Sequence, residues 1–186
     1  MATNSGKKFE KCFANSVPDY CLSYRLKDPP QSFNTNIAGI RFSWDNPCDY
    51  FVFSNKHRFL LALELKSTKY PSISFEDIRL GNDQPKKMIH KHQIEDLMKI
   101  NADNDYAVGG FLFNFRNDDN GAEVCYYQNA DDFWDMAESL GKKSFNAIDL
   151  IKSGTAIKVG GMKKRVNYSW DIDSLIEQIS KQINEQ

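Results

Sequence analysis

Paired cysteines, long apolar runs and an excess of one charge are all missing from this sequence of 186 residues. The absence of a Cys-x-x-Cys pair argues against a zinc site or a disulfide framework and favours reduced, mostly buried thiols (Cys12, Cys21, Cys48 and Cys125). No stretch approaches the ~18 apolar residues of a membrane span, and the segment MATNSGKKFEKCF lacks the apolar core of a signal peptide. We therefore expect a soluble, cytoplasmic protein that has no membrane partner.

Composition and patterning predict one folded domain over residues 1–186. Apolar residues make up 41% and aromatic residues 13%, and no internal repeat or long linker divides the chain. The order of the expected helices and strands, given in the next sentence, predicts an α/β fold in which helices flank a mixed central sheet. We expect strands at 20–26, 49–53, 59–66, 106–115 and 123–128, and helices at 7–16, 86–100 and 129–140, then a short helix that Ser144 caps and a last helix with an apolar stripe at Leu175, Ile176, Ile179 and Ile183.

Two opposite charges end a strand that is otherwise apolar. The run Phe59–Leu63 is apolar on both faces, as in a strand buried inside a sheet, but it continues into Glu64 and Lys66. Side chains alternate along a strand, so Glu64 and Lys66 share one face. Asp49 opens the preceding strand, and a turn near 54–58 would bring Asp49 to the same end of the hairpin. The pattern therefore predicts two carboxylates and an ammonium at one place.

This trio has two interpretations. Asp49 and Glu64 suit Mg²⁺, which prefers one or two carboxylates plus waters, while Lys66 would orient or help to deprotonate an attacking water. Alternatively, Glu64 and Lys66 form an exposed ion pair worth a few tenths of a kcal/mol. The trio alone leaves both interpretations open.

The predicted helix at 86–100 adds a polar residue to an apolar stripe. Ile89, Gln93 and Leu97 lie at successive i, i+4 positions, so Gln93 falls on the stripe that should face the sheet. A buried glutamine needs hydrogen-bond partners, which a polar site at the strand ends would supply. A position at the edge of the stripe, bonded to backbone, is the alternative.

With these residues in place, the sequence resembles the PD-(D/E)XK nucleases, and among them the RecU-type Holliday junction resolvases of Gram-positive bacteria and their phages. The resemblance runs from about residue 6 onward, and it depends on Asp49, on Glu64-Leu65-Lys66, and on HKHQIEDL at 90–97. It implies a restriction-endonuclease-like fold, Mg²⁺ (or Mn²⁺) bound by Asp49 and Glu64, a water-activating Lys66, and Gln93 completing the site. Glu10 matches an acidic residue on the first helix of many members, although a solvated helix face explains Glu10 nearly as well.

The segment 28–47, with three of the six prolines, occupies the place of the stalk in that family. Phe42 matches a stalk aromatic residue, with Arg41 and Trp44 beside it, and such a ring stacks on unpaired bases. Packing of Phe42 and Trp44 against the core is the alternative. The segment is short for a stalk and has few cations, which leaves the DNA specificity open.

Clusters of cations are the remaining argument for DNA, because the net charge of −1 gives no general attraction to it. Each cluster alone also fits a solvated face; the clusters are Lys7, Lys8 and Lys11, then Lys86, Lys87 and Lys91, and finally Lys163, Lys164 and Arg165. The sequence and the resemblance together predict a homodimer that binds four-way junction DNA and nicks it in a paired manner. Another nuclease of the same fold and a junction-binding protein that does not cut are the two alternatives.

Overall fold

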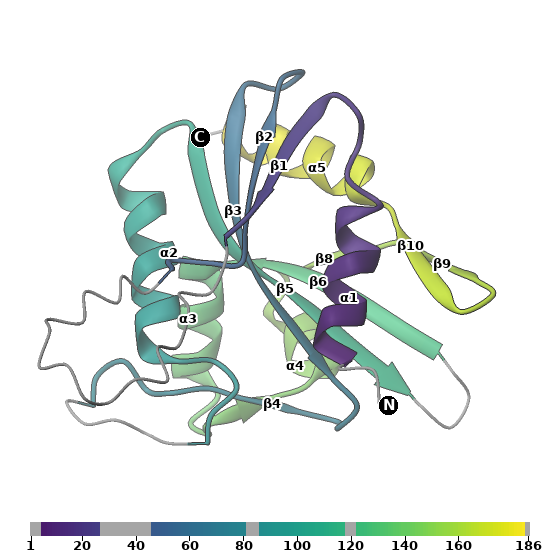
Figure 1. Cartoon of the computed structure of the whole chain (residues 1–186). Helices are drawn as coiled ribbons and strands as arrows, with labels where there is room; N and C mark the ends of the chain where they lie inside the picture. Colours follow the sequence, from purple (N-terminus) through teal and green to yellow (C-terminus); the bar gives the residue numbers. More distant parts are fainter. Residues whose placement is uncertain (1–4, 27–45, 81–85, 118–121, 185–186) are drawn as a thin grey trace, which may run out of the picture.

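A six-stranded mixed sheet forms the centre of the protein in a computed structural model that describes residues 5–26, 46–80, 86–117 and 122–184 (Figure 1). The strand order is β1-β2-β3-β5-β6-β8, in which β3 and β5 run parallel and the other neighbours run antiparallel. The strands are β1 (Cys21–Arg25), β2 (Tyr50–Ser54), β3 (Phe59–Thr68), β5 (Ala107–Asn117), β6 (Ala122–Asn129) and β8 (Ile157–Val159).

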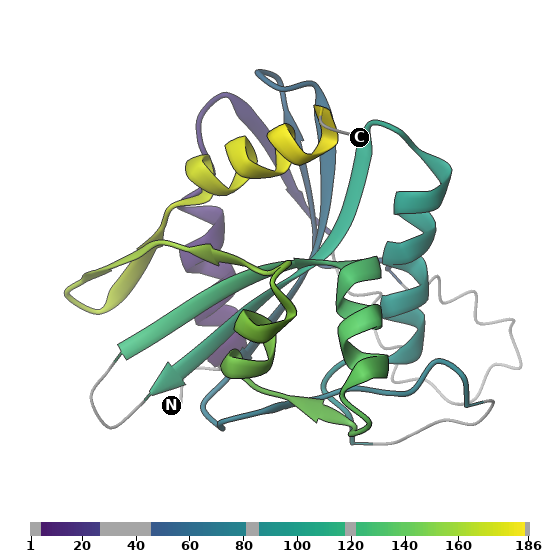
Figure 2. The ribbon, with the colours of Figure 1, turned by 180° about the vertical axis from the view of Figure 1, so that it is seen from behind.

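Helices cover both faces of this sheet (Figures 1 and 2). One apolar cluster joins the sheet to α1 (Ser5–Ala14) and α5 (Ile172–Asn184), and a second joins the other face to α2 (Lys91–Asp103), α3 (Ala130–Ser139) and α4 (Ala147–Ser153). Two small sheets complete the fold: β4 (Ile73–Ser74) pairs with β7 (Ser144–Phe145), and β9 (Gly161–Lys164) pairs with β10 (Asn167–Trp170). The described residues therefore form a single α/β domain.

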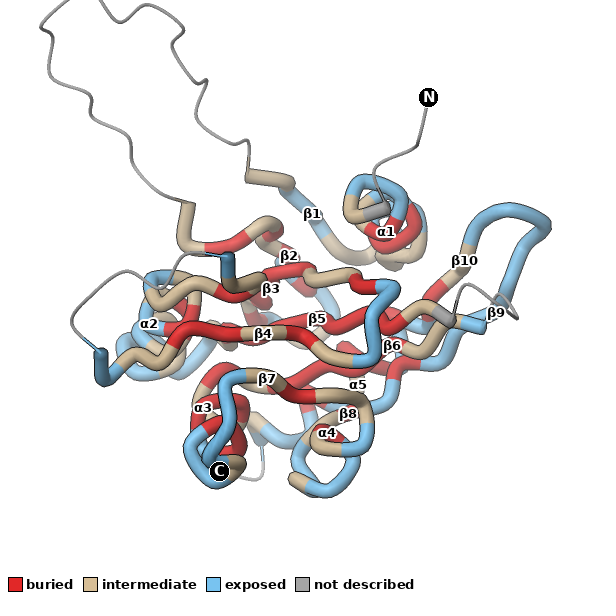
Figure 3. Tube along the Cα trace, turned by 90° about the horizontal axis from the view of Figure 1, so that it is seen from below, coloured by how far each residue is buried: buried red, intermediate tan, exposed pale blue. Residues whose placement is uncertain are grey.

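The alternation of side chains along β3 divides the core in two. Leu61, Leu63 and Leu65 belong to the cluster with α1 and α5, whereas Ala62 belongs to the cluster with α2 and α3. Buried positions follow the central strands between α1 on one side and α3 and α4 on the other (Figure 3). Glu64 and Lys66 therefore point to the face that α2 covers.

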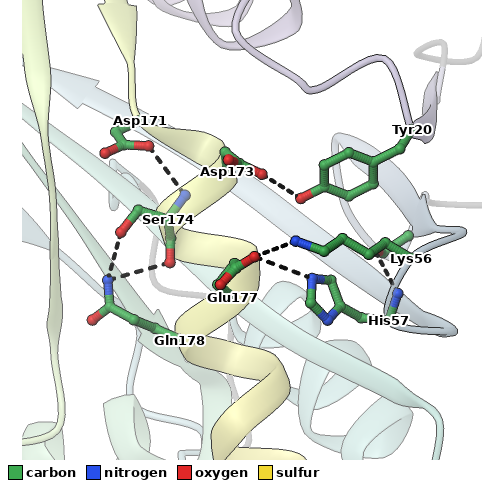
Figure 4. A network of polar contacts seen from close by, with 9 residues as sticks. Tyr20, Lys56, His57, Asp171, Asp173, Ser174, Glu177 and Gln178 are labelled. Carbon is green, nitrogen blue, oxygen red and sulfur yellow. Dashed lines mark hydrogen bonds and ion pairs between the residues drawn. The ribbon is translucent and has the colours of Figure 1, made fainter.

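Polar contacts join helix α5 to the residue before β1 and to the turn between β2 and β3 (Figure 4). The hydroxyl of Tyr20, just before β1, donates to Asp173 at 2.5 Å. In the turn between β2 and β3, Lys56 forms an ion pair with Glu177, and Nε2 of His57 lies 3.9 Å from the same carboxylate. These contacts, on top of the apolar stripe, hold α5 across the β1–β2–β3 end of the sheet.

The predicted helices and the five predicted strands are present, but β4, β7, β8, β9 and β10 were not predicted, and β8 belongs to the central sheet. Two predicted details are wrong. The second helix was expected at 86–100, but α2 begins at Lys91: Ile89 lies outside it, in a parallel bridge with Phe75, and His90 has an extended backbone. The expected cap at Ser144 is wrong, because Ser144 pairs with Ser74 and Asn146 caps α4 by accepting from the backbone N–H groups of Ile148 and Asp149.

The structure tests two further expectations only in part. The stalk-like segment 28–47 lies outside the described residues except at its end, Asn46 and Pro47. Within the ranges that are described, no helix combines the length and the apolar character needed to cross a membrane.

Candidate active site

Strand pairing brings Asp49 to the end of β3 that carries Glu64. Tyr50 pairs with Leu63, so Asp49, one residue earlier, comes opposite Glu64. The backbone N–H of Asp49 donates to the carbonyl of Leu63 at 3.0 Å, and the N–H of Leu65 donates to Oδ2 of Asp49 at 2.8 Å. These bonds continue the β2–β3 ladder and fix the Asp49 carboxylate beside the strand.

Glu64 is the buried centre of a polar cluster whose other members are half-buried. Its side chain is almost fully buried, and its Oε1 accepts from Nζ of Lys66 at 2.8 Å and from Nε2 of Gln93 at 2.6 Å. Burial of a carboxylate without partners costs several kcal/mol, and the hydrogen bonds from Lys66 and Gln93 offset part of this cost. The exposed ion pair considered from the sequence is excluded, because the side chains of Glu64 and Lys66 are only 5% and 14% exposed.

The start of α2 positions Gln93. Its Oε1 accepts from the backbone N–H of His90 at 3.0 Å, which turns its NH₂ group toward Glu64. A buried carboxylate, Glu76, holds the same helix end: it accepts from the backbone N–H of Lys91 at 2.7 Å and lies 3.1 Å from Nδ1 of His90. A negative charge is favourable at this end of a helix, so Glu76 fixes the position from which Gln93 reaches Glu64.

The two carboxylates make the site short of positive charge. Burial and, after it, the nearby charge of Glu64 raise the pKa of Asp49 to about 7, although the Leu65 N–H and Lys66 act in the opposite direction. Burial, together with the charges of Glu64 and Asp49, also raises the pKa of the neighbouring Cys48 thiol to about 12. A bound cation would therefore be electrostatically favoured between Asp49 and Glu64.

The donor set fits a small, hard cation. In the described part of the chain, no group of three or more His, Cys, Asp or Glu residues is arranged to hold a metal ion. Asp49 and Glu64 bring two carboxylates to this place, and Mg²⁺ prefers one or two carboxylates with waters in its other positions.

The raised pKa of Asp49 makes the stability of the fold depend on pH, which gives a first test of the electrostatics of the site. The Asp49 pKa of about 7 in the folded state exceeds the unfolded value of about 3.9, so its stabilising effect is present at low pH and is lost as the pH rises through 7. In EDTA, Asp49→Asn should therefore gain stability relative to wild type between pH 5 and pH 8, by about 1–3 kcal/mol. Urea unfolding at each pH measures this, and parallel profiles of the two proteins would contradict it. At pH 8, added Mg²⁺ should stabilise wild type and not Asp49→Asn.

Glu10 approaches the site from α1. Its carboxylate accepts from Nε of Arg25 at 2.7 Å, and its charge is among the smaller influences that raise the pKa of Asp49. Glu10 is therefore near the cluster but already engaged by a cation.

The predicted DNA-binding residues are dispersed. Lys7 and Lys8 are exposed on α1, and Lys91 lies 3.6 Å from Glu95 on α2. The basic cluster at 163–165 lies in the β9–β10 hairpin, on the side of the molecule opposite α2 (Figures 1 and 2). The three basic clusters thus do not all face the acidic site. Arg41 and Phe42 lie outside the described residues.

Two neighbours of the site were not predicted from the sequence. Glu76 stands beside Asp77 in the segment that leads to α2, and nothing in the sequence distinguishes it as a partner of the start of that helix. Cys48 stands directly before Asp49 in the chain. The sequence predicted that its thiol is buried, and its exposure is 3%, but its place beside the site was not predicted.

Fold and site together define a mixed α/β domain with a partly buried Asp–Glu–Lys–Gln cluster at the β2–β3 hairpin. No family model matches the chain. The chain is 31% identical, over 191 residues, to the SPbeta prophage-derived uncharacterized protein YotM of Bacillus subtilis (strain 168), in an alignment that covers 97% of this chain and 89% of that protein. The chain therefore belongs to the family of this prophage-derived protein.

Proposed function

We propose that the protein is a Mg²⁺-dependent endonuclease of the PD-(D/E)XK type that resolves four-way DNA junctions by paired nicking as a homodimer. One observation carries the nuclease part: Oε1 of the buried Glu64 accepts from both Lys66 and Gln93, and the Asp49 carboxylate stands opposite on the neighbouring strand. This arrangement suits hydrolysis of a phosphodiester.

Each residue has a role that its contacts support. Asp49 and Glu64 would hold Mg²⁺, with Mn²⁺ as a substitute, and the bound metal would stabilise negative charge on the phosphate. The ammonium of Lys66, already 2.8 Å from Glu64, orients the attacking water and favours loss of its proton. Gln93 restrains Glu64 through its 2.6 Å hydrogen bond, so that the carboxylate keeps one orientation.

Junction specificity depends on weaker support. The resemblance to RecU-type resolvases implies a restriction-endonuclease-like fold, a stalk at 28–47 and a homodimer, and the mixed sheet with helices on both faces is compatible with that fold. The prophage origin in the name of the relative YotM agrees with the occurrence of such resolvases in phages.

A junction-binding protein that does not cut is the candidate from another class. A pure binder has no need of a buried carboxylate that requires two partners, so the Glu64 cluster favours the nuclease. A restriction or repair nuclease of the same fold would share the cluster and differ in its substrates.

The test is cleavage of a mobile synthetic four-way junction by the purified chain. We expect paired nicks in Mg²⁺ and none in EDTA, because the carboxylates need a cation to act on a phosphodiester. A linear duplex of the same sequence is the control. Equal cleavage of both substrates would reject the resolvase and leave a general nuclease, and tight junction binding without cleavage would favour the binding protein.

A further inference from the structure

We propose that a groove beyond the end of β3 binds an unpaired single-stranded segment of DNA, with a base stacked on Tyr70. The groove has a volume of about 800 Å³. Its walls are the turn after β3, the end of β5, the start of β6 and the start of α4. The inference rests on the proposed nuclease function, because it names how the strand next to the cutting site is held.

The groove continues from the acidic site on the same face of the sheet. Lys66 pairs with Phe113 and Thr68 pairs with Phe115, and Phe115 lines the groove. Residues two apart on a strand share a face, so the groove follows directly after Lys66. Lys69 comes three residues after Lys66, or about 10 Å along an extended chain.

The lining is complementary to a nucleic acid strand. Lys69 is cationic, and none of the described residues that line the groove is acidic. Arg116 also belongs to the wall, but it follows Phe115 directly and lies opposite Glu123 in the β5–β6 pairing, so its side chain falls on the other face of the sheet. By contrast, another surface groove, between α3 and α4, is lined by Asp132, Asp135 and Asp149 with a single lysine. The described walls next to Lys66 therefore offer a lysine and no carboxylate, which suits a phosphate.

Tyr70 offers a ring for a base. Its side chain is 65% exposed, whereas its backbone N–H is held by Oγ1 of the buried Thr68 at 2.9 Å. Nζ of Lys69 lies 5.6 Å from the centre of the ring, so a cation accompanies the aromatic surface. On the opposite wall, Ile148 is 59% exposed and adds apolar surface. An aromatic ring beside a cation is an arrangement that single-strand binders use.

The experiment measures binding without cleavage. A fluorescein-labelled deoxythymidine oligomer of about 15 nucleotides, near the upper site size of single-strand binders, is titrated with the full chain in EDTA and followed by anisotropy. We expect Tyr70→Ala to weaken binding about tenfold, because the stacked base is lost, and Tyr70→Phe to bind as wild type does. Binding of a blunt duplex should not change, since its base faces are covered. Lys69→Ala should lower the slope of log Kd against log salt by about 0.7.

Matched controls come from elsewhere on the surface. Tyr106 is 75% exposed at the other end of β5, and Lys181 is exposed on α5, so Tyr106→Ala and Lys181→Ala remove the same groups away from the groove. These variants should bind the oligomer as wild type does. Absence of oligomer binding, or equal losses in Tyr70→Ala and Tyr106→Ala, would overturn the proposed groove.

Failure of the groove and failure of the nuclease are separate results. Junction cleavage in Mg²⁺ with no effect of Tyr70→Ala on oligomer binding rejects the groove alone. Oligomer binding that depends on Tyr70, without cleavage of any DNA in Mg²⁺, supports the groove and rejects the nuclease.

Discussion

Replacement of Glu64 by glutamine should reduce Mg²⁺-dependent cleavage of a junction roughly a thousandfold, which corresponds to the several kcal/mol that a metal ion contributes to such a reaction. Glutamine has nearly the same shape, but it removes one of the two carboxylates that would hold the metal. Junction binding in EDTA should be equal or tighter, because a negative charge near the phosphates is removed. Single-turnover cleavage and electrophoretic binding assays measure the two effects.

Glu95→Gln is the matched control, since Glu95 is exposed on α2 and its side chain contacts Lys91 rather than the cluster. It should cut at the wild-type rate. Full activity in Glu64→Gln would show that the catalytic site lies elsewhere, and the proposed role of Asp49 would fail with it.

Gly109→Ala should destabilise the fold by about 3 kcal/mol, the upper end of the usual cost of overpacking. A Cβ at Gly109 would lie 2.4 Å from the carbonyl oxygen of Leu97, so α2 and β5 would have to move apart. Asn101 also ties this helix to the strand, because its Oδ1 accepts from the N–H of Gly109 at 2.6 Å. Since α2 carries Gln93, the variant should also lose cleavage at temperatures where it stays folded.

Gly160→Ala is the control for this prediction. A Cβ there would meet only the Asp171 side chain, at 3.4 Å, which is ordinary contact. Thermal and urea unfolding of both variants give the comparison. Equal stabilities would mean that the α2–β5 approach tolerates a methyl group and does not fix the position of Gln93.

The central hairpin and its charges were predictable because strand alternation is a local rule. The turn near 54–58 set the register, and from it Asp49 was correctly expected at the end of β3 that carries Glu64. Gln93 was found because helical spacing aligned it with Leu97. The same spacing wrongly placed Ile89 in the helix. Ile89 is buried on that face, but it pairs with Phe75 before the helix begins.

What escaped prediction depends on contacts between distant segments. Glu76 contacts the start of α2 through the His90 ring and the Lys91 N–H, and the residues around Glu76 in the sequence do not indicate these contacts. Ser144 and Asn146 are both good helix caps by residue type, and the choice between them was made by the pairing of Ser144 with Ser74. Such pairings follow from the folded chain and leave no periodic signal in the sequence.

The attachment of α5 to Tyr20 and to the β2–β3 turn has a consequence for synthesis on the ribosome. Its contacts join residues 153 and 121 positions apart, and Trp170 N–H bonds to Ser16 across 154 positions. Strands β1 to β3 therefore emerge roughly 100 residues before the helix that covers one of their faces, a delay of about 5–20 seconds at ordinary rates of translation. During that interval the apolar side chains that will meet α5 are open to solvent and to chaperones, and the domain closes only when its last helix arrives.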